Sequence, residues 1–196
     1  MEHYYSEQQK SLTKLRKIKQ KIKGHEFGFY TASGVFSKER IDRGTLVLAE
    51  NMIVNKNSKV LDVGCGIGIL GIAAAKLFNA DITMSDINKR AVMLAKMNIK
   101  LNSIKAEIYQ GSLYEKIKNN DFDVVLSNPP QTAGKNICFQ LIEQSKKYLE
   151  NNGTFQLVAR HNKGGKTLSK KMEEVFGNVR VIAKKSGYWV YLSVKN

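Results

Sequence analysis

Pro129 and Pro130 stand side by side and are the only prolines among the 196 residues of the chain. They follow Asn128 and the apolar run 122–127, which predicts a β-strand. A proline restricts the residue before it to extended geometry, so Asn128 and Pro129 are both kept out of the helical region. Such a stiff loop can hold the Asn128 side-chain oxygen and the Pro129 carbonyl as two fixed acceptors. Two fixed acceptors suit a planar –NH2 group presented between them.

A second candidate site is the glycine-rich stretch 60–71, VLDVGCGIGILG. Glycine removes the side chain where the backbone turns from a strand into a helix, and it lets a ligand lie against bare main chain. Residues 66–71 also satisfy G-x-G-x-x-G, and Asp86 follows Gly66 by about 20 residues, where a carboxylate can hold ribose hydroxyls. A nicotinamide-dependent dehydrogenase is therefore one alternative.

Asp62 argues for a different ligand. It precedes the glycines, where a dinucleotide would bring its pyrophosphate, so this acid suits a ligand with an amino group instead. The pattern D-x-G-x-G-x-G followed by an acid after the next strand resembles the class I S-adenosylmethionine-dependent methyltransferases. By that resemblance Asp62 lies near the methionine moiety and Asp86 binds the ribose. The further cofactor contacts that it implies are Gly64, Cys65, Gly66, Gly68, Ile87, Ser112, Leu113 and Asn128.

With a sulfonium methyl donor, the two acceptors gain a chemical purpose. An exocyclic amine is a poor nucleophile because its lone pair is delocalised, and it becomes positively charged as it attacks a methyl group. Acceptors that stabilise this charge act more strongly in the transition state than in the ground state, so they raise the rate. We therefore expect Asn128, Pro129 and Pro130 to be catalytic residues.

The motif N-P-P is that of amino-group methyltransferases, whose substrates include adenine, guanine and the glutamine side chain of release factors. Enzymes that act on adenine or glutamine usually place Tyr or Phe directly after the prolines, whereas this chain has Gln131. The wider pattern resembles the small-subunit ribosomal RNA guanine-amine methyltransferases and their single-domain archaeal relatives. The stretches that carry this resemblance are 33–48, 60–72, 127–135 and 187–195.

The resemblance implies methylation of the exocyclic amine of a guanosine in RNA, most of all ribosomal RNA. It also places Phe36 and Thr45 at the cofactor pocket. Ser112 stands where many relatives have Asp, so the adenine amino group would be recognised by a hydroxyl or by backbone. Phe36, Phe29 or Tyr114 could supply a ring for the extruded base. The alternatives are methylation of adenine or of a protein glutamine, and a basic RNA-binding module that keeps a cofactor fold without turnover.

These residues need a scaffold that brings loop ends together, and the chain supplies alternating strands and helices. Asp42 predicts the N-cap of a helix that ends near Met52. The predicted strands are 59–63, 81–85, 106–110, 122–127, 154–159, 179–185 and 188–194. The further predicted helices are 69–78, 88–102, 135–149 and 166–176. With the resemblance, this pattern predicts an α/β, Rossmann-like class I methyltransferase fold: a mostly parallel seven-stranded sheet with one antiparallel strand and helices on both faces.

The formal net charge of +15 favours a polyanionic partner. Residues 10–23 carry seven basic side chains and no acid, and their apolar residues have roughly helical spacing. We expect a basic helix or arm over 1–28 and the methyltransferase domain over 29–196. The longest apolar run, 67–75, is too short to span a membrane. Two cysteines without CxxC spacing predict neither a disulfide framework nor a metal site, and the chain is expected to be cytoplasmic.

Overall fold

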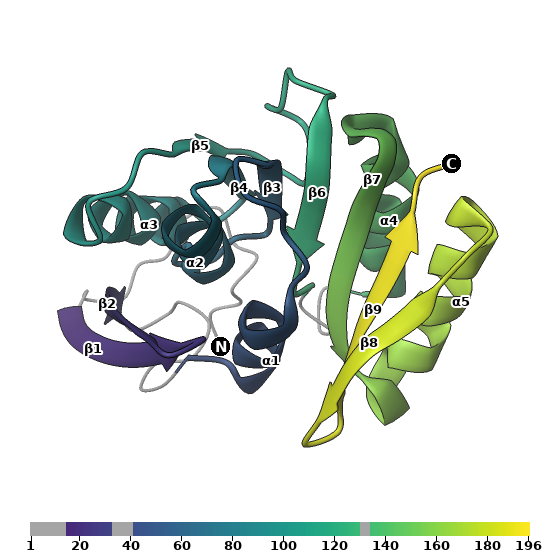
Figure 1. Ribbon diagram of the computed structural model, residues 1–196, viewed down its shortest axis with the longest axis horizontal. Helices are drawn as coiled ribbons and strands as arrows, with labels where there is room; N and C mark the ends of the chain where they lie inside the picture. The colour runs from purple at the N-terminus through teal and green to yellow at the C-terminus, as the bar shows by residue number, and fades with distance from the viewer. Residues whose placement is uncertain (1–14, 33–40, 130–133) are drawn as a thin grey trace.

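The computed structural model describes residues 15–32, 41–129 and 134–196 (Figure 1). A β-hairpin and a helix precede a regular alternation of strands and helices, and two strands close the chain. The strands are β1 (Leu15–Ile22), β2 (His25–Ala32), β3 (Lys59–Val63), β4 (Asp81–Asp86), β5 (Glu107–Gln110), β6 (Phe122–Ser127), β7 (Leu149–Arg160), β8 (Arg180–Lys185) and β9 (Tyr188–Val194). The helices are α1 (Arg43–Asn51), α2 (Ile69–Phe78), α3 (Lys89–Leu101), α4 (Lys135–Tyr148), α5 (Lys166–Phe176) and the short π-helix η1 (His161–Gly165).

Seven strands form one sheet in the order β5-β4-β3-β6-β7-β9-β8. β9 is antiparallel to both of its neighbours, and the other six strands are parallel to one another. The predicted α/β, Rossmann-like sheet with one antiparallel strand is therefore confirmed. The strand order reverses between β3 and β6, and ligands bind at such a reversal beyond the carboxyl ends of the strands. We call this side of the sheet the carboxyl edge; the amino end of β9 also lies there.

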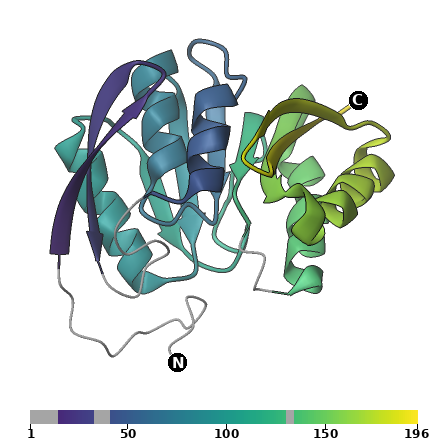
Figure 2. The ribbon, with the colours of Figure 1, turned by 90° about the horizontal axis from the view of Figure 1, so that it is seen from below.

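Helices cover both faces of the sheet (Figures 1 and 2). Successive strand residues point to opposite faces. Val124 and Leu126 of β6 therefore join the core beneath α1, α2 and α3, whereas Val125 joins the core beneath α4 and α5. Because both faces are covered, the polar side chains that are free to meet a ligand are concentrated at the strand ends.

Residues 15–22 do not form the predicted basic helix; they form β1, which pairs with β2 in an antiparallel hairpin. The side chains of Ile18 and Ile22 pack toward the hydrophobic core, and Ile22 is fully buried. Three lysines between or beside them are exposed: Lys17, Lys19 and Lys21. The helix prediction was wrong because apolar residues spaced four apart fit both the period of an α-helix, 3.6 residues, and the period of a β-strand, 2 residues. Residues 15–22 form a strand because they pair with the apolar, aromatic strand β2 in the hairpin.

The hairpin packs on the domain beside α3 (Figure 2). Phe27 and Phe29 of β2 belong to the same core as α2 and α3. β2 runs across residue 28, where the boundary between arm and domain is predicted, and the domain division itself stays a prediction. Of the helices in the described part of the chain, none combines the length and apolar character needed to cross a membrane.

Candidate active site at the carboxyl edge

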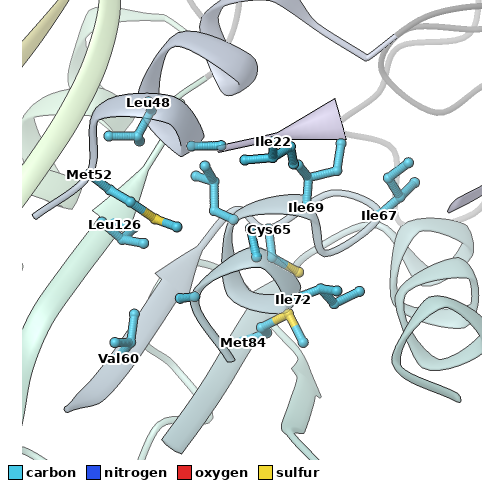
Figure 3. Packing of buried hydrophobic residues seen from close by; sticks show 14 of the residues in the cluster. Ile22, Leu48, Met52, Val60, Cys65, Ile67, Ile69, Ile72, Met84 and Leu126 are labelled. Atoms are coloured by element: carbon cyan, nitrogen blue, oxygen red, sulfur yellow. The ribbon is translucent and has the colours of Figure 1, made fainter. Parts of the chain in front are cut away.

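The glycine loop between β3 and α2 presents its backbone and buries its side chains. Gly64, Gly66 and Gly68 have φ of +70°, +57° and +85°, in the left-handed region that favours glycine. Between them, Cys65 and Ile67 point into the core (Figure 3). Burial raises the pKa of the Cys65 thiol well above its ordinary value, so the thiol stays protonated and is no nucleophile. A ligand at this loop would meet main chain.

Three backbone N–H groups of this loop already have acceptors inside the protein. Those of Gly64 and Cys65 donate to the carbonyl of Ser85, over 2.8 and 3.0 Å. The Gly66 N–H donates to Oδ2 of Asp86 over 2.8 Å. A dinucleotide would need such N–H groups for its pyrophosphate. The geometry therefore disfavours the nicotinamide alternative.

Asp86 lies at the end of β4, directly against the loop. Its Oδ1 accepts the N–H of Asn88 over 2.8 Å, so each carboxylate oxygen has a backbone donor. Asn88 in turn caps α3 by accepting two N–H groups of its first turn. These bonds fix the Asp86 carboxylate at the end of β4, and its contact with the ribose stays a prediction.

Asp62 is 1% exposed, and its two oxygens differ. Oδ2 accepts the N–H of Gly71 over 3.0 Å, whereas Oδ1 has no hydrogen-bond partner in the described residues. Burial raises the pKa of Asp62 to about 7 against the opposing effect of the Gly71 hydrogen bond, and the nearby charge of Asp86 adds to the rise. An ammonium group beside Oδ1 would supply the missing donor and the missing countercharge. The amino group of S-adenosylmethionine fits this requirement.

Gly71 shows why one position in the first turn of the helix after this loop carries no side chain. A Cβ added there would lie 2.8 Å from Sδ of Met84 and 3.0 Å from Cγ2 of Ile82. Helix α2 therefore packs directly on β4, and this contact brings the Gly71 N–H to Asp62.

The segment after β5 completes this side of the edge. The Gly111 N–H donates to the carbonyl of Asp86, and the Ser85 hydroxyl donates to the carbonyl of Leu113 over 2.8 Å. Ser112 is exposed, and its N–H and carbonyl both bond to Glu115. These bonds place Ser112 and Leu113 beside the end of β4, and Ile87 is half-buried next to Asp86. The contacts of these residues with the cofactor stay a prediction.

Asn128 follows β6 and lies close to the glycine loop. β6 pairs with β3, and the Ser127 hydroxyl donates to the carbonyl of Val63, the last residue of β3. The Asn128 side chain turns to the start of α1, where Nδ2 donates to Oδ2 of Asp42 over 2.8 Å and to Oγ1 of Thr45 over 2.7 Å. The same Asp42 oxygen accepts the Thr45 N–H over 2.9 Å and thereby caps α1.

These contacts define which end of the Asn128 amide is available. A carboxylate oxygen only accepts hydrogen bonds, so Asp42 must face the –NH2 end of Asn128. Both amide hydrogens are then used, and Oδ1 has no donor in the described part of the chain. Donation by the –NH2 group also polarises the amide and strengthens Oδ1 as an acceptor. Thr45, predicted to lie at the cofactor pocket, accepts a hydrogen bond from Asn128, and its place at the cofactor stays a prediction.

Phe36 and Pro130 lie outside the described residues, and Pro129 is buried. Phe29 and Tyr114 cannot supply a ring for an extruded base, because they are 0% and 1% exposed and belong to the two cores. Their aromatic character serves packing.

Sequence reasoning did not identify two residues as parts of the site. Asp42 was expected only to cap a helix, although its place in the D-x-G-T segment could have indicated a shared role with Thr45. Asn98 of α3 is fully buried; its Nδ2 donates to the carbonyls of Ile67 and Tyr30. It therefore ties the glycine loop to β2, and no local pattern marks it.

Comparison with known proteins shows the family to which the chain belongs. The family model described as "Methyltransferase small domain" matches residues 26–192. A Bacillus subtilis protein described as "Uncharacterized protein YbxB" is 34% identical over 99% of this chain and 98% of its own length. "Ribosomal RNA small subunit methyltransferase C" of Haemophilus influenzae is 33% identical over 85% of this chain. The chain spans only 51% of the length of that relative.

Among solved structures, the 16S rRNA N2 methyltransferase RsmC of T. thermophilus, in complex with AdoMet and guanosine, has a TM-score of 0.82. The match covers 93% of this chain and 51% of that one, at 23% identity. A methyltransferase from Pyrococcus furiosus has a TM-score of 0.67, 21% identity, and coverage of 74% and 78%. At these identities the structures support the fold. The fold, the orphan oxygen of Asp62 and the family match together show that the chain belongs to the methyltransferase small domain family of class I S-adenosylmethionine-dependent methyltransferases.

Proposed function

We propose that this protein transfers a methyl group from S-adenosylmethionine to the exocyclic amine of a guanosine in RNA, with ribosomal RNA as the best substrate. One observation carries the proposal: the Asn128 amide is fixed with its –NH2 end on Asp42 and Thr45, which leaves Oδ1 as an acceptor beside the glycine loop. The choice of guanosine in ribosomal RNA is supported by two of the similar proteins, the Haemophilus influenzae ribosomal RNA small subunit methyltransferase C and the T. thermophilus RsmC in complex with guanosine.

The residues of the chain have distinct roles in this reaction. S-adenosylmethionine supplies an electrophilic methyl group on a sulfonium when bound. Asp62 holds the amino group of the cofactor, and Asp86 holds its ribose. Oδ1 of Asn128 and the carbonyl of Pro129 accept hydrogen bonds from the target –NH2 group, orient it, and stabilise the positive charge that it gains during attack. The Asp42 carboxylate behind Asn128 adds negative potential at the same place.

Thr45 provides a test of this orientation. Thr45→Val removes the hydroxyl that accepts from Asn128 Nδ2 but keeps the shape of the side chain and the N-cap bond to Asp42. We expect the single-turnover rate at saturating RNA and cofactor to fall about tenfold, the effect of one neutral hydrogen bond. The Kd for S-adenosylmethionine, measured by calorimetry, should stay within about twofold. Thr45→Ser, which keeps the hydroxyl, should retain the rate; equal losses in both variants would contradict the orienting role.

The proposed substrate is tested by the identity of the methylated nucleoside. Purified protein is incubated with S-adenosylmethionine carrying a ¹³C-labelled methyl group and with an unmodified transcript of 16S ribosomal RNA or with small ribosomal subunits. The RNA is digested and its nucleosides are identified by mass spectrometry. We expect label in N2-methylguanosine.

Other outcomes would overturn the proposal in identifiable ways. Label in N6-methyladenosine would make the protein an adenine methyltransferase, and label in protein glutamine would remove RNA as the substrate. No label in any substrate, together with measurable RNA binding, would favour a binding module without turnover. The exposed lysines of β1 and the charge of +15 support an RNA partner.

A further inference from the structure

A cluster of aromatic rings and cationic side chains lies at the carboxyl edge, on the side of β7 that faces β9. We call it the basic corner and define it as residues 160–166 and 184–189. It joins the end of β7, η1, and the turn between β8 and β9. The His161 N–H donates to the carbonyl of Gly187 over 3.0 Å, so the two segments are bonded to each other.

The basic corner lies next to the Asn128 site. Ser127 pairs with Leu157 of β7, and β7 continues for three residues past that point to Arg160, which pairs with Tyr188 of β9. On the α1 side, a Cβ added at Gly44 would lie 2.9 Å from Cε1 of Tyr188. The same Cβ would lie 2.9 Å from Oδ2 of Asp42, the oxygen that holds Asn128. Figure 2 shows the turn between β8 and β9 beside α1.

Two rings of the corner form a stack. The rings of His161 and Trp189 lie 3.4 Å apart between centroids, with 13° between their planes. Nζ of Lys184 lies 4.2 Å from the centroid of the Trp189 ring. Both rings are half-buried, so each keeps part of its surface in contact with solvent. This distinguishes them from Phe29 and Tyr114, which are enclosed in the cores.

A hydrogen bond fixes the orientation of His161. Its Nδ1 lies 2.8 Å from Oη of Tyr191. Burial raises the pKa of Tyr191 to about 12, so this hydroxyl stays protonated. Burial, together with the charges of Lys166 and Lys184, lowers the pKa of His161, so the imidazole is neutral near pH 7. The hydroxyl can then donate to Nδ1, which leaves the imidazole proton on Nε2 and the ring plane fixed.

The charge around this stack has one sign. The two segments of the corner contain five basic side chains and no acidic one: Arg160, Lys163, Lys166, Lys184 and Lys185. All five are exposed. In the described part of the chain, neither Lys166 nor Lys184 is paired with a carboxylate. Fixed rings surrounded by cations suit a nucleic acid whose bases stack and whose phosphates need neutralising.

We propose that the basic corner binds the RNA strand that carries the target guanosine, and that His161, supported by Trp189, is the ring against which an unpaired base of that strand stacks. This inference rests on the proposed function. It gives the site a stacking surface that Gln131, directly after the two prolines, does not provide. The lysines hold the phosphates on either side of the stacked base.

The first test replaces the ring. His161→Ala should raise the Kd for the unmodified 16S transcript, measured by filter binding without cofactor, and the KM in methyl transfer, each about tenfold. His161→Phe keeps a planar ring on Trp189 and should stay within about threefold of the parent protein. If both variants bind like the parent, or if both lose the same affinity, His161 is not the stacking ring.

The second test changes charge at matched positions. Lys166→Glu with Lys184→Glu should weaken binding of the transcript and reduce the slope of log K against log salt by about 0.7 for each lost phosphate contact with a single strand. Lys56→Glu with Lys118→Glu makes the same charge change at exposed lysines near the amino ends of β3 and β6. If both pairs of substitutions weakened binding of the transcript equally, the basic corner would contribute only general electrostatic attraction, and the proposal would be wrong.

A third readout needs no substitution. Trp189 is the only tryptophan of the chain, so its fluorescence reports on the corner alone. We expect emission to change as the transcript saturates the protein, and unchanged emission at saturation would contradict the proposal.

The experiments distinguish failure of this inference from failure of the proposed function. If the parent protein binds RNA through the basic corner but does not methylate guanosine, the proposed function is wrong and the RNA-binding role of the basic corner stands. If the parent protein methylates guanosine and the variants of the basic corner behave like it, the RNA-binding role of the basic corner is wrong and the proposed function stands.

Discussion

Replacing Asn128 by alanine should lower the rate of methyl transfer about 100- to 1000-fold, the effect seen when one group that stabilises transition-state charge is removed. The variant loses Oδ1, and it also leaves Asp42 and Thr45 without their shared donor. Because the acceptor acts mainly in the transition state, the loss should appear in the single-turnover rate at saturating substrates. The Kd for RNA and for S-adenosylmethionine should each change by less than about fivefold.

Asn119→Ala is the matched control for this variant. Asn119 is exposed before β6, near the amino end of that strand, so the same chemical change there should leave the rate unaltered. If Asn128→Ala kept more than about a third of the parent rate, the Asn128 oxygen would have no part in stabilising the transition state. A loss confined to RNA affinity would also contradict the proposed role.

Replacing Asp62 by asparagine should change stability and cofactor affinity in opposite directions. The pKa of Asp62 in the folded protein, about 7, is above its ordinary value of 3.8. Between these pH values the folded state binds more protons than the unfolded state. The contribution of this group to the free energy of unfolding therefore falls as the pH rises from about 4 to about 7. Asparagine is never charged, so this loss should disappear in the variant.

The stability effect is measured by thermal unfolding without cofactor. At pH 8 Asp62→Asn should melt roughly 10 °C above the parent protein, and at pH 4 the two should melt within about 2 °C of each other. The control Asp81→Asn changes an exposed carboxylate at the start of β4 and should have no such pH-dependent effect. A parent-like melting temperature at pH 8 would mean that the Asp62 charge is not disfavoured by burial.

The affinity effect has the opposite sign. The amino group of S-adenosylmethionine loses its countercharge in Asp62→Asn, and the asparagine –NH2 group can face it in place of the orphan oxygen. We expect the Kd, measured by calorimetry at pH 8, to rise about 10- to 100-fold, the range for a hydrogen bond between charged groups. An unchanged Kd together with raised stability would place the amino group away from Asp62.

Much of the fold follows from short-range patterns in the sequence. The predicted bounds 59–63, 69–78, 122–127, 166–176 and 188–194 match β3, α2, β6, α5 and β9. Such segments are predictable because apolar runs of the right length are bounded by glycine, asparagine or proline, which act locally. The segment 15–22 failed because its apolar spacing fits two periods, and only pairing with β2 decides between them.

The sequence by itself determined the fold class, and it predicted the glycine loop and the Asn128 motif as the site, because each pattern depends on residues that are neighbours in the chain. Only the tertiary structure decided what holds and surrounds that motif. Asp42 is 86 residues away from Asn128 in sequence, and His161 and Tyr191 are 30 residues apart, yet each pair is joined by a hydrogen bond. Burial likewise removed Phe29 and Tyr114 from the candidate rings. The physical reason is that contacts between distant segments arise only when the sheet brings its strand ends to one edge.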